Sequence, residues 1–162
     1  ALDTIEELIG SVERKGALKS NTGNIVVDAL VNHAWSEAVE KKIDFQVRLD
    51  SLSGVVIPNA ELCILLGNAL DNALEASLYL PEDQRVVWVE ICYAKECLLI
   101  SLRNRYTGEL KLRGSRLQSR KGEKGHGIGT FSMQKAATKL GGTMTIKDND
   151  GFFSLEIWIP CS

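Results

Sequence analysis

The stretch GNALDNALEAS, residues 67–77, places two asparagines, Asn68 and Asn72, four positions apart in a segment that otherwise has a helical composition. Asparagine is unfavourable inside a helix because its short amide competes for backbone hydrogen bonds. Residues four apart lie on the same face of a helix, so the two amides point the same way. The pair predicts a helix whose asparagine side chains have a function outside the core.

The rest of this helix separates into an apolar and a polar face at about 100° per residue. The apolar face contains Leu62, Leu66, Ala69, Ala73 and Ala76. The polar residues form a stripe that contains Glu61, Asn68, Asn72, Glu75 and Tyr79. A solvent face is one interpretation of this polar stripe. Solvent faces favour charged side chains, however, whereas uncharged amides suit a ligand that needs oxygen donors, such as Mg²⁺.

A second informative stretch, KGHGIGTFSMQKAATKLGG at residues 124–142, has three glycines at alternate positions that open a predicted helix at about 128–140. Such glycines let backbone N–H groups approach a phosphate, and a helix N-terminus adds partial positive charge. The dinucleotide pattern G-x-G-x-x-G is not met because Thr130 replaces the third glycine, and a Walker P-loop would need G-K-[ST]. A flexible hinge is the alternative for the glycines alone. The asparagine stripe favours phosphate binding.

The composition is that of one globular domain, with 162 residues, 44% hydrophobic, 25% charged and a formal net charge of −2. We expect no nucleic-acid partner, because the basic loop at 103–124 contains a single aromatic residue, Tyr106. The four cysteines form no C-x-x-C pair, which argues against a zinc site or a disulfide framework and favours reduced, cytoplasmic thiols. No apolar run reaches the length of about 18 residues that a membrane span needs. The chain lacks an initiator methionine, so we expect a fragment of a longer protein.

Hydrophobic periodicity predicts the remaining elements. We expect helices around residues 5–12 and 27–38, a strand at 43–49, a hairpin of 85–93 with 98–102, and a second hairpin of 143–147 with 152–159. The segment between the first hairpin and the glycines shows no periodicity.

Together, the two informative stretches resemble the catalytic ATP-binding domain of bacterial sensor histidine kinases, in the superfamily that also holds gyrase, heat-shock chaperones and the MutL repair proteins. LGNALDNALEA, at 66–76, resembles the asparagine box, and GHGIGTFSMQKAATKLGG, at 125–142, resembles the last glycine box. The resemblance extends over residues 24–160, and its beginning, at 28–49, is similar to peptide quorum-sensing and citrate-sensor-type kinases. It implies an α/β (α+β) two-layer sandwich of the Bergerat type. The expected sheet is mixed and mostly antiparallel, with helices on one face.

The resemblance also implies roles for individual residues. Asn72 matches the Mg²⁺-ligating asparagine, and Asn68 matches the asparagine that replaces the water-activating glutamate of gyrase-like relatives. An amide cannot accept a proton, which suits an enzyme that holds ATP for transfer rather than hydrolysis. Asn68 and Asn72 are the expected catalytic residues, and both are expected to contact ATP. The other expected nucleotide contacts are Asn104, Gly108, Lys124, Gly125, His126, Gly127, Ile128, Gly129 and Thr130.

Three positions depart from the family pattern. In the first glycine box, Asn104 stands where an aspartate contacts adenine, and Tyr106 replaces a glycine. Glu75 stands where many kinases have a lysine. These departures favour an alternative, a non-catalytic interaction module of the same fold that has lost nucleotide binding. No phosphoacceptor motif surrounds His33 or His126, so the acceptor histidine is expected outside this chain.

The expected function is that of the ATP-binding catalytic domain of a two-component sensor histidine kinase, with ATP and Mg²⁺ as cofactors. Residues 1–22 are expected to be the tail of a dimerisation helix and a linker, and residues 23–162 the catalytic domain. The basic segment at 103–124 is expected to be a nucleotide lid or a solvated loop. Expected partners are the dimerisation and phosphoacceptor domain of the same kinase and, indirectly, a response regulator. The full-length protein is expected to be a membrane-anchored homodimer with this domain in the cytoplasm.

Overall fold

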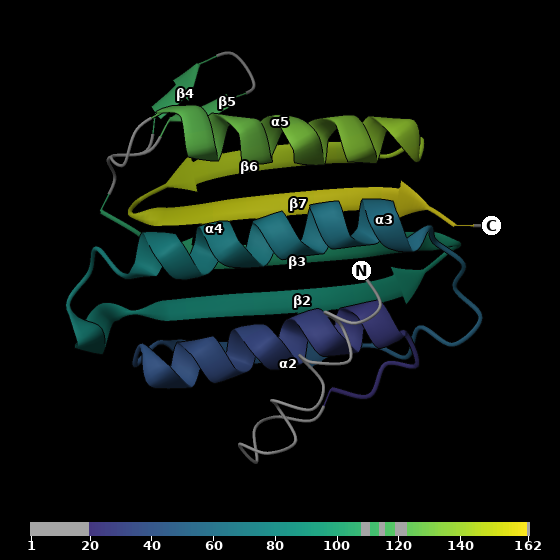
Figure 1. The fold of residues 1–162 in the computed structure, drawn as a ribbon, viewed down its shortest axis with the longest axis horizontal. Coiled ribbons are helices and arrows are strands. Elements are labelled where there is room, and N and C mark those ends of the chain that lie inside the picture. The colour runs from purple at the N-terminus through teal and green to yellow at the C-terminus, as the bar shows by residue number, and fades with distance from the viewer. Residues whose placement is uncertain (1–19, 108–110, 114–115, 119–122, 162) are drawn as a thin grey trace.

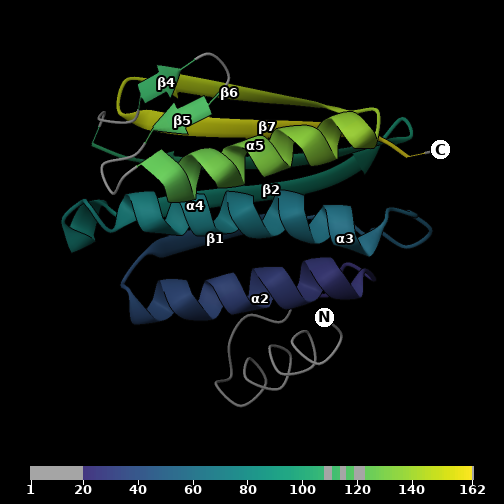
Figure 2. The ribbon, with the colours of Figure 1, turned by 45° about the horizontal axis from the view of Figure 1, so that its top comes forward.

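The computed structural model describes residues 20–107, 111–113, 116–118 and 123–161 as a two-layer fold (Figure 1). Three long helical segments lie on one face of a five-stranded sheet, and Figure 2 shows both layers obliquely. The helical layer contains α2 (Ile25–Glu40), α3 (Asn59–Leu62), the π-helical turn η1 (Cys63–Gly67), α4 (Asn68–Ser77) and α5 (Glu123–Lys139). A short 3₁₀ turn, η2 (Glu82–Gln84), precedes the second strand.

The sheet is mixed and mostly antiparallel, as the sequence predicts. Its strands are β1 (Asp44–Leu49), β2 (Val86–Ala94), β3 (Cys97–Arg105), β6 (Thr143–Asn149) and β7 (Phe152–Pro160), in the order β1-β2-β3-β7-β6. β1 pairs with β2 in parallel, and the other three pairs are antiparallel. Two further short strands, β4 (Lys111–Arg113) and β5 (Arg116–Gln118), form a separate pair in a segment for which no periodicity was expected.

Both predicted hairpins are confirmed, with tight turns that need left-handed backbone. Lys95 and Glu96 have φ of 53° and 58° between β2 and β3, and Asp150 and Gly151 have φ of 50° and 80° between β6 and β7. Two positive φ values in a row match the twist of the strands that such a turn joins. Asp150–Gly151 is a sequence that favours such a turn, whereas Lys95 and Glu96 adopt it without this local preference.

The core lies between the sheet and the helices. Alternate residues of β2, β3 and β7 point toward the helices and are buried, whereas the corresponding residues of the edge strands β1 and β6 are at most half-buried. Leu98, Ile100 and Ile157 are fully buried on the sheet side, where Leu65 and Leu66 meet them from the helical side. Burial of these large apolar side chains supplies the main driving force for folding.

A hydrogen-bond network fixes the chain ahead of α2. Asn24 caps the helix, because its Oδ1 accepts hydrogen bonds from the backbone N–H groups of Val26 and Val27 at 3.0 Å. Asp28 Oδ1 accepts from the Ser20 hydroxyl at 2.6 Å, and from the backbone and hydroxyl of Thr22 at 2.9 Å each. The described end of the predicted linker is thus tied to the first turn of α2.

Candidate functional site

Two antiparallel neighbouring helices frame the site. The Lys139 ammonium, in the last turn of α5, lies 2.8 Å from the Glu61 carboxylate in α3. This hydrogen-bonded ion pair lowers the pKa of Glu61 and raises that of Lys139. Since it joins the end of α5 to the start of α3, the first turns of α5 lie beside the C-terminal half of α4 (Figures 1 and 2).

The asparagine helix carries an irregularity that the sequence did not predict. Cys63–Gly67 is π-helical, so the regular step of about 100° is interrupted there, and the predicted stripe is continuous only from Asn68 onward. Asn68 lies directly after this turn, and its Nδ2 donates to the Ile64 carbonyl at 2.8 Å. One donor of the Asn68 amide therefore stabilises its own helix, while its oxygen stays an acceptor.

The apolar face of α4 agrees with the prediction in all but one position. Leu62, Leu66, Ala69 and Ala73 are buried, and only Ala76 is half-buried. On the polar side, Asn68, Asn72 and Glu75 are half-buried, and Tyr79 is exposed. The amides are thus accessible to a ligand while the helix stays anchored through its opposite face.

Asp71, beside Asn72 on α4, lies near charged groups of α2. Partial loss of solvating water, followed by the charge of Glu37 on α2, raises the pKa of Asp71, and the charge of His33 opposes this rise. His33 therefore lies near an acidic group on the outer side of α4. Nothing in these contacts marks His33 as an acceptor of phosphate.

α5 begins earlier than predicted. The helix starts at Glu123 rather than near residue 128, so Lys124, Gly125, His126, Gly127 and Ile128 lie inside its first turns together with Gly129. The glycines concealed this start, because glycine lowers helix propensity. The first four N–H groups of a helix have no intrahelical partner, and here they belong to residues 123–126. Thr130, one turn further, is fully buried.

The end of β3 forms the third side of the site, next to the two helices. β3 extends to Arg105, three residues beyond the predicted strand end, so Asn104 lies on the strand rather than in a loop. Asn104 is 1% exposed and faces the helices, in one cross-strand row with Phe153 of β7 and Asp148 of β6. Its Nδ2 donates to the Arg105 carbonyl at 3.0 Å.

Two basic residues that were assigned to the predicted lid lie elsewhere. Arg103 and Arg105 belong to β3 and point to the sheet face opposite the helices. The Arg103 guanidinium lies 4.2 Å from the ring centre of Phe152 and 5.2 Å from that of Trp88, which are cation–π contacts. These two arginines are therefore not part of a nucleotide lid.

Tyr106 is a site residue whose role sequence reasoning did not predict. It is 5% exposed, and its ring meets Phe153 edge-on, with ring centres 6.1 Å apart at 71°. Burial, followed by the interaction with the Asp148 carboxylate, raises the pKa of its hydroxyl, although the two groups lie outside good hydrogen-bond geometry. The signal was present in the sequence, since Tyr106 replaces a glycine of the family pattern.

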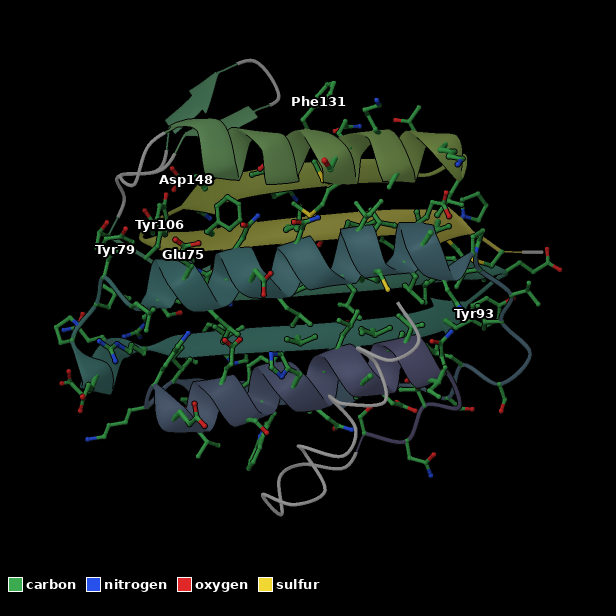
Figure 3. All side chains as sticks on the ribbon, in the orientation of Figure 1. Glu75, Tyr79, Tyr93, Tyr106, Phe131 and Asp148 are labelled. Atoms are coloured by element: carbon green, nitrogen blue, oxygen red, sulfur yellow. The ribbon has the colours of Figure 1, made fainter. Side chains whose placement is uncertain are left out.

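The predicted site residues thus come from three elements, of which α4 contacts both α5 and β3. Figure 3 marks the C-terminal end of α4 with the labels Glu75 and Tyr79, and the adjoining end of the sheet with Tyr106 and Asp148. Asn68 and Asn72 come from α4, Asn104 from β3, and the segment 124–130 from α5. Gly108, also predicted to contact nucleotide, lies outside the described residues. Of the described helices, none combines the length and the apolar character that a membrane crossing requires.

Comparison with known proteins gives consistent results. The family model described as "GHKL domain" matches residues 58–160. The sensor histidine kinase DpiB of Escherichia coli K12 is 31% identical over 111 residues, which cover 64% of this chain and 20% of DpiB. The chain therefore spans about a fifth of that relative's length.

Solved structures of histidine kinases share the fold. The catalytic domain of histidine kinase ThkA superposes with a TM-score of 0.63 at 16% identity, covering 81% of this chain and 90% of that one. The Acinetobacter baumannii histidine kinase AdeS gives 0.62 at 14% identity, covering 98% and 76% of the two chains. The mycobacterial sensor histidine kinase MprB gives 0.58 at 16% identity, covering 82% and 92%. The predicted two-layer fold is thereby confirmed.

Proposed function

The chain belongs to the GHKL domain family, and on this premise we propose that it binds Mg²⁺–ATP and transfers the γ-phosphoryl group to a histidine of a dimerisation domain. One observation carries the proposal. α4, which carries the asparagine pair, contacts both α5 and β3, and the first turns of α5 and the end of β3 lie beside its C-terminal half. α4 offers an oxygen ligand for a cation, the start of α5 offers N–H groups without intrahelical partners for phosphates, and β3 offers a polar side chain for a base.

Asn72 is the proposed Mg²⁺ ligand. Mg²⁺ prefers oxygen and usually takes most of its ligands from substrate phosphates and water, so a single amide oxygen is a fitting protein contribution. Within the described residues, no group of three or more His, Cys, Asp or Glu side chains could hold a metal ion alone. A cation that arrives with the nucleotide agrees with this donor set. The bound ion would neutralise charge on the phosphates.

We assign Asn68 the role of positioning the γ-phosphate of ATP without activating a water molecule. Its position in the helix is that of a general base in hydrolytic relatives, but an amide does not accept a proton at neutral pH. Its Nδ2 is already bonded to the Ile64 carbonyl, which fixes the orientation of the side chain. Positioning without a base favours transfer to a protein acceptor over loss of phosphate to water.

The first turns of α5 are the proposed phosphate contact. Backbone N–H groups at its N-terminus lack intrahelical partners, and the helix dipole favours an anion there. We assign this role to Lys124, Gly125 and His126, whose N–H groups are among the first four of α5. Gly127, Ile128, Gly129 and Thr130 stay predicted nucleotide contacts, as does Gly108, but the N–H groups of residues 127–130 lie beyond the first four of the helix. Glycine at alternate positions keeps side chains away from the approaching phosphates.

The proposed partners follow from the expectation that the acceptor histidine lies outside this chain. We propose that residues 1–22 continue into a dimerisation helix that carries the acceptor histidine, and that residues 23–162 form the catalytic domain. In the whole protein, two such chains would form a homodimer, anchored in a membrane with this domain in the cytoplasm, and would pass phosphate on to a response regulator. The resemblance to peptide quorum-sensing and citrate-sensor-type kinases stays a prediction.

Phosphotransfer tests the proposal. The domain is incubated with ATP labelled at the γ-phosphate, alone and with a matching dimerisation domain supplied separately. We expect negligible label on the domain alone and label on the supplied histidine, and Asn72→Ala should abolish the transfer. Label on His33 or His126 would contradict the proposal, because it would place the acceptor inside this chain.

A non-catalytic interaction module is the second candidate. It is favoured by Tyr106, whose buried ring fills a position that is glycine in the family pattern. This candidate predicts that the domain binds no nucleotide at all, which calorimetry decides directly.

A further inference from the structure

The sheet face opposite the helices carries a basic and aromatic patch at the end where β3 finishes and β7 begins. We call it the outer patch, and its residues are Trp88, Arg103, Arg105, Lys147, Phe152 and Ser154. Trp88, Arg103, Ser154 and Lys147 lie in one cross-strand row, and Arg105 lies opposite Phe152 in the next row on the same face. The helices that the structure describes lie on the other face, so they leave this patch uncovered (Figures 1 and 2).

Two guanidinium groups share one aromatic ring in the outer patch. The Arg103 guanidinium lies 4.2 Å from the ring centre of Phe152, and the Arg105 guanidinium lies 5.3 Å from the same centre. Trp88 adds a second ring, whose centre is 5.9 Å from that of Phe152. A stacked guanidinium uses its face, so the N–H donors at its edge stay available. Both arginines are exposed, and they present these donors to solvent.

The cations of the outer patch have no counter-ion among the described residues. The ion pairs of those residues use other cations, and Arg48 on the same face is paired with Glu90 at 3.5 Å. The row of Arg103 contains no carboxylate. Like charges gathered around one ring repel one another, whereas an anion between them would accept charge-assisted hydrogen bonds. The outer patch therefore has the chemistry of an anion-binding surface.

The outer patch is small and bordered by carboxylates. Neighbouring rows on one face are about 7 Å apart, so two rows match one or two anionic groups. The surrounding acidic residues are Asp44, Glu82, Asp83, Glu90, Glu156, Asp148 and Asp150. A nucleic acid has a phosphate at every nucleotide and would meet these carboxylates, and its bases would find the ring of Phe152 already stacked with Arg103. A protein segment with one or two carboxylates fits better.

We propose that the outer patch binds an acidic segment of a partner protein, whose Asp or Glu carboxylates accept hydrogen bonds from Arg103 and Arg105. Tryptophan and arginine are the residues that most often dominate the binding energy of protein interfaces. A hollow of about 320 Å³, lined by Trp88 and Arg103 together with residues of β1, gives room for an adjoining side chain of the partner. The contact is small, so it is weak and sensitive to salt. It lies on the face opposite the proposed nucleotide site and does not rest on the proposed function.

Fluorescence anisotropy of labelled peptides tests the proposal. The probes are short peptides in which glycine alternates with glutamate, with glutamine or with lysine, and an oligothymidylate of the same length. The proteins are the wild type, Arg103→Gln, Arg105→Gln and Ser154→Glu. The matched control is Lys135→Gln, which removes one positive charge from α5 on the helical face, where the Lys135 ammonium lies 5.5 Å from the ring centre of Phe131.

We expect the wild type to bind the glutamate peptide more tightly than the other two peptides, with an affinity that falls as salt rises. Arg103→Gln and Arg105→Gln should each lower this affinity about threefold to tenfold, because each removes a charged donor. Ser154→Glu should abolish binding, because it puts a carboxylate between Arg103 and Lys147. The same carboxylate gains opposite charges across the strands, so this variant should melt at or above the wild-type temperature. Lys135→Gln should keep the wild-type affinity.

Three results would overturn the inference. The first is equal binding of the three peptides by the wild type, and the second is wild-type affinity in Ser154→Glu and both arginine variants. The third is an oligothymidylate that binds more tightly than the glutamate peptide and is lost in the same variants, because the patch would then serve a nucleic acid. Thermal melting shows which variants are folded, and Ser154→Glu decides if an arginine variant is not.

Discussion

Replacing Asn104 with aspartate should weaken the fold and strengthen ATP binding at the same time. Asn104 is 1% exposed, and its Nδ2 lies 3.0 Å from the Arg105 carbonyl oxygen. Aspartate removes this hydrogen bond, worth about 1 kcal/mol, and puts a buried carboxylate oxygen near a carbonyl oxygen, which costs about 1–3 kcal/mol more. The free energy of unfolding should fall by about 2–4 kcal/mol, and the melting temperature by about 5–15 °C.

ATP binding should change in the opposite direction. A carboxylate accepts a charge-assisted hydrogen bond from the adenine amino group, so Asn104→Asp should tighten ATP by about 1 kcal/mol, or about fivefold. GTP should gain nothing, because its 6-oxo group is an acceptor. In the wild type, the bond to the Arg105 carbonyl resists an amide flip that would favour GTP. The ratio of ATP to GTP affinity should therefore rise in the variant.

Calorimetric melting and competition of ATP and GTP for a fluorescent nucleotide measure both effects. Asn149→Asp is the matched control, because the same substitution at this exposed residue of β6 should change neither quantity much. An unchanged melting temperature for Asn104→Asp would refute the buried hydrogen bond. Unchanged ATP affinity together with an unchanged ATP/GTP ratio would show that Asn104 does not face the base.

Three further predictions concern the scaffold. Asp28→Ala should lower the free energy of unfolding by about 2–3 kcal/mol in urea titration, because three hydrogen bonds converge on its carboxylate; an unchanged midpoint would contradict this. Gly142→Ala should prevent stable folding, because a Cβ there overlaps backbone of β7, whereas Gly67→Ala, which meets nothing within 4 Å, should raise the melting temperature slightly. Glu61→Gln should destabilise the fold more at pH 7 than at pH 3, because Lys139 lowers the pKa of Glu61. The stability that its carboxylate adds is present above its unfolded pKa and is lost as pH falls through its folded pKa; equal melting losses at both pH values would contradict it.

The sequence predicted the elements whose signals are local. Alternating apolar residues and left-handed turn residues define both hairpins, and the apolar face of α4 is visible as a helical period. The asparagine pair and the glycines match a family pattern, and the two helices that carry them are in contact. Local chemistry was sufficient in each of these cases.

What could not be predicted depends on contacts between distant segments. The last part of β3 has the polar composition of a loop. In the structure, however, the Arg103 guanidinium makes cation–π contacts with Trp88 and Phe152, which come from other strands. The π-helical turn before Asn68 has no local sequence signal. The Tyr106–Asp148 pair becomes visible only when the register places Asp148 in the row of Phe153.

Isothermal titration calorimetry of ATP, with and without Mg²⁺, on the wild type and on Asn72→Ala tests the central claim most directly. The wild type should bind ATP more tightly with Mg²⁺ than without it. Asn72→Ala should lose this Mg²⁺-dependent gain while its melting temperature stays near that of the wild type, because a half-buried amide on the polar face contributes little to the core. Absence of ATP binding by the wild type, or a full Mg²⁺-dependent gain in Asn72→Ala, would contradict the account.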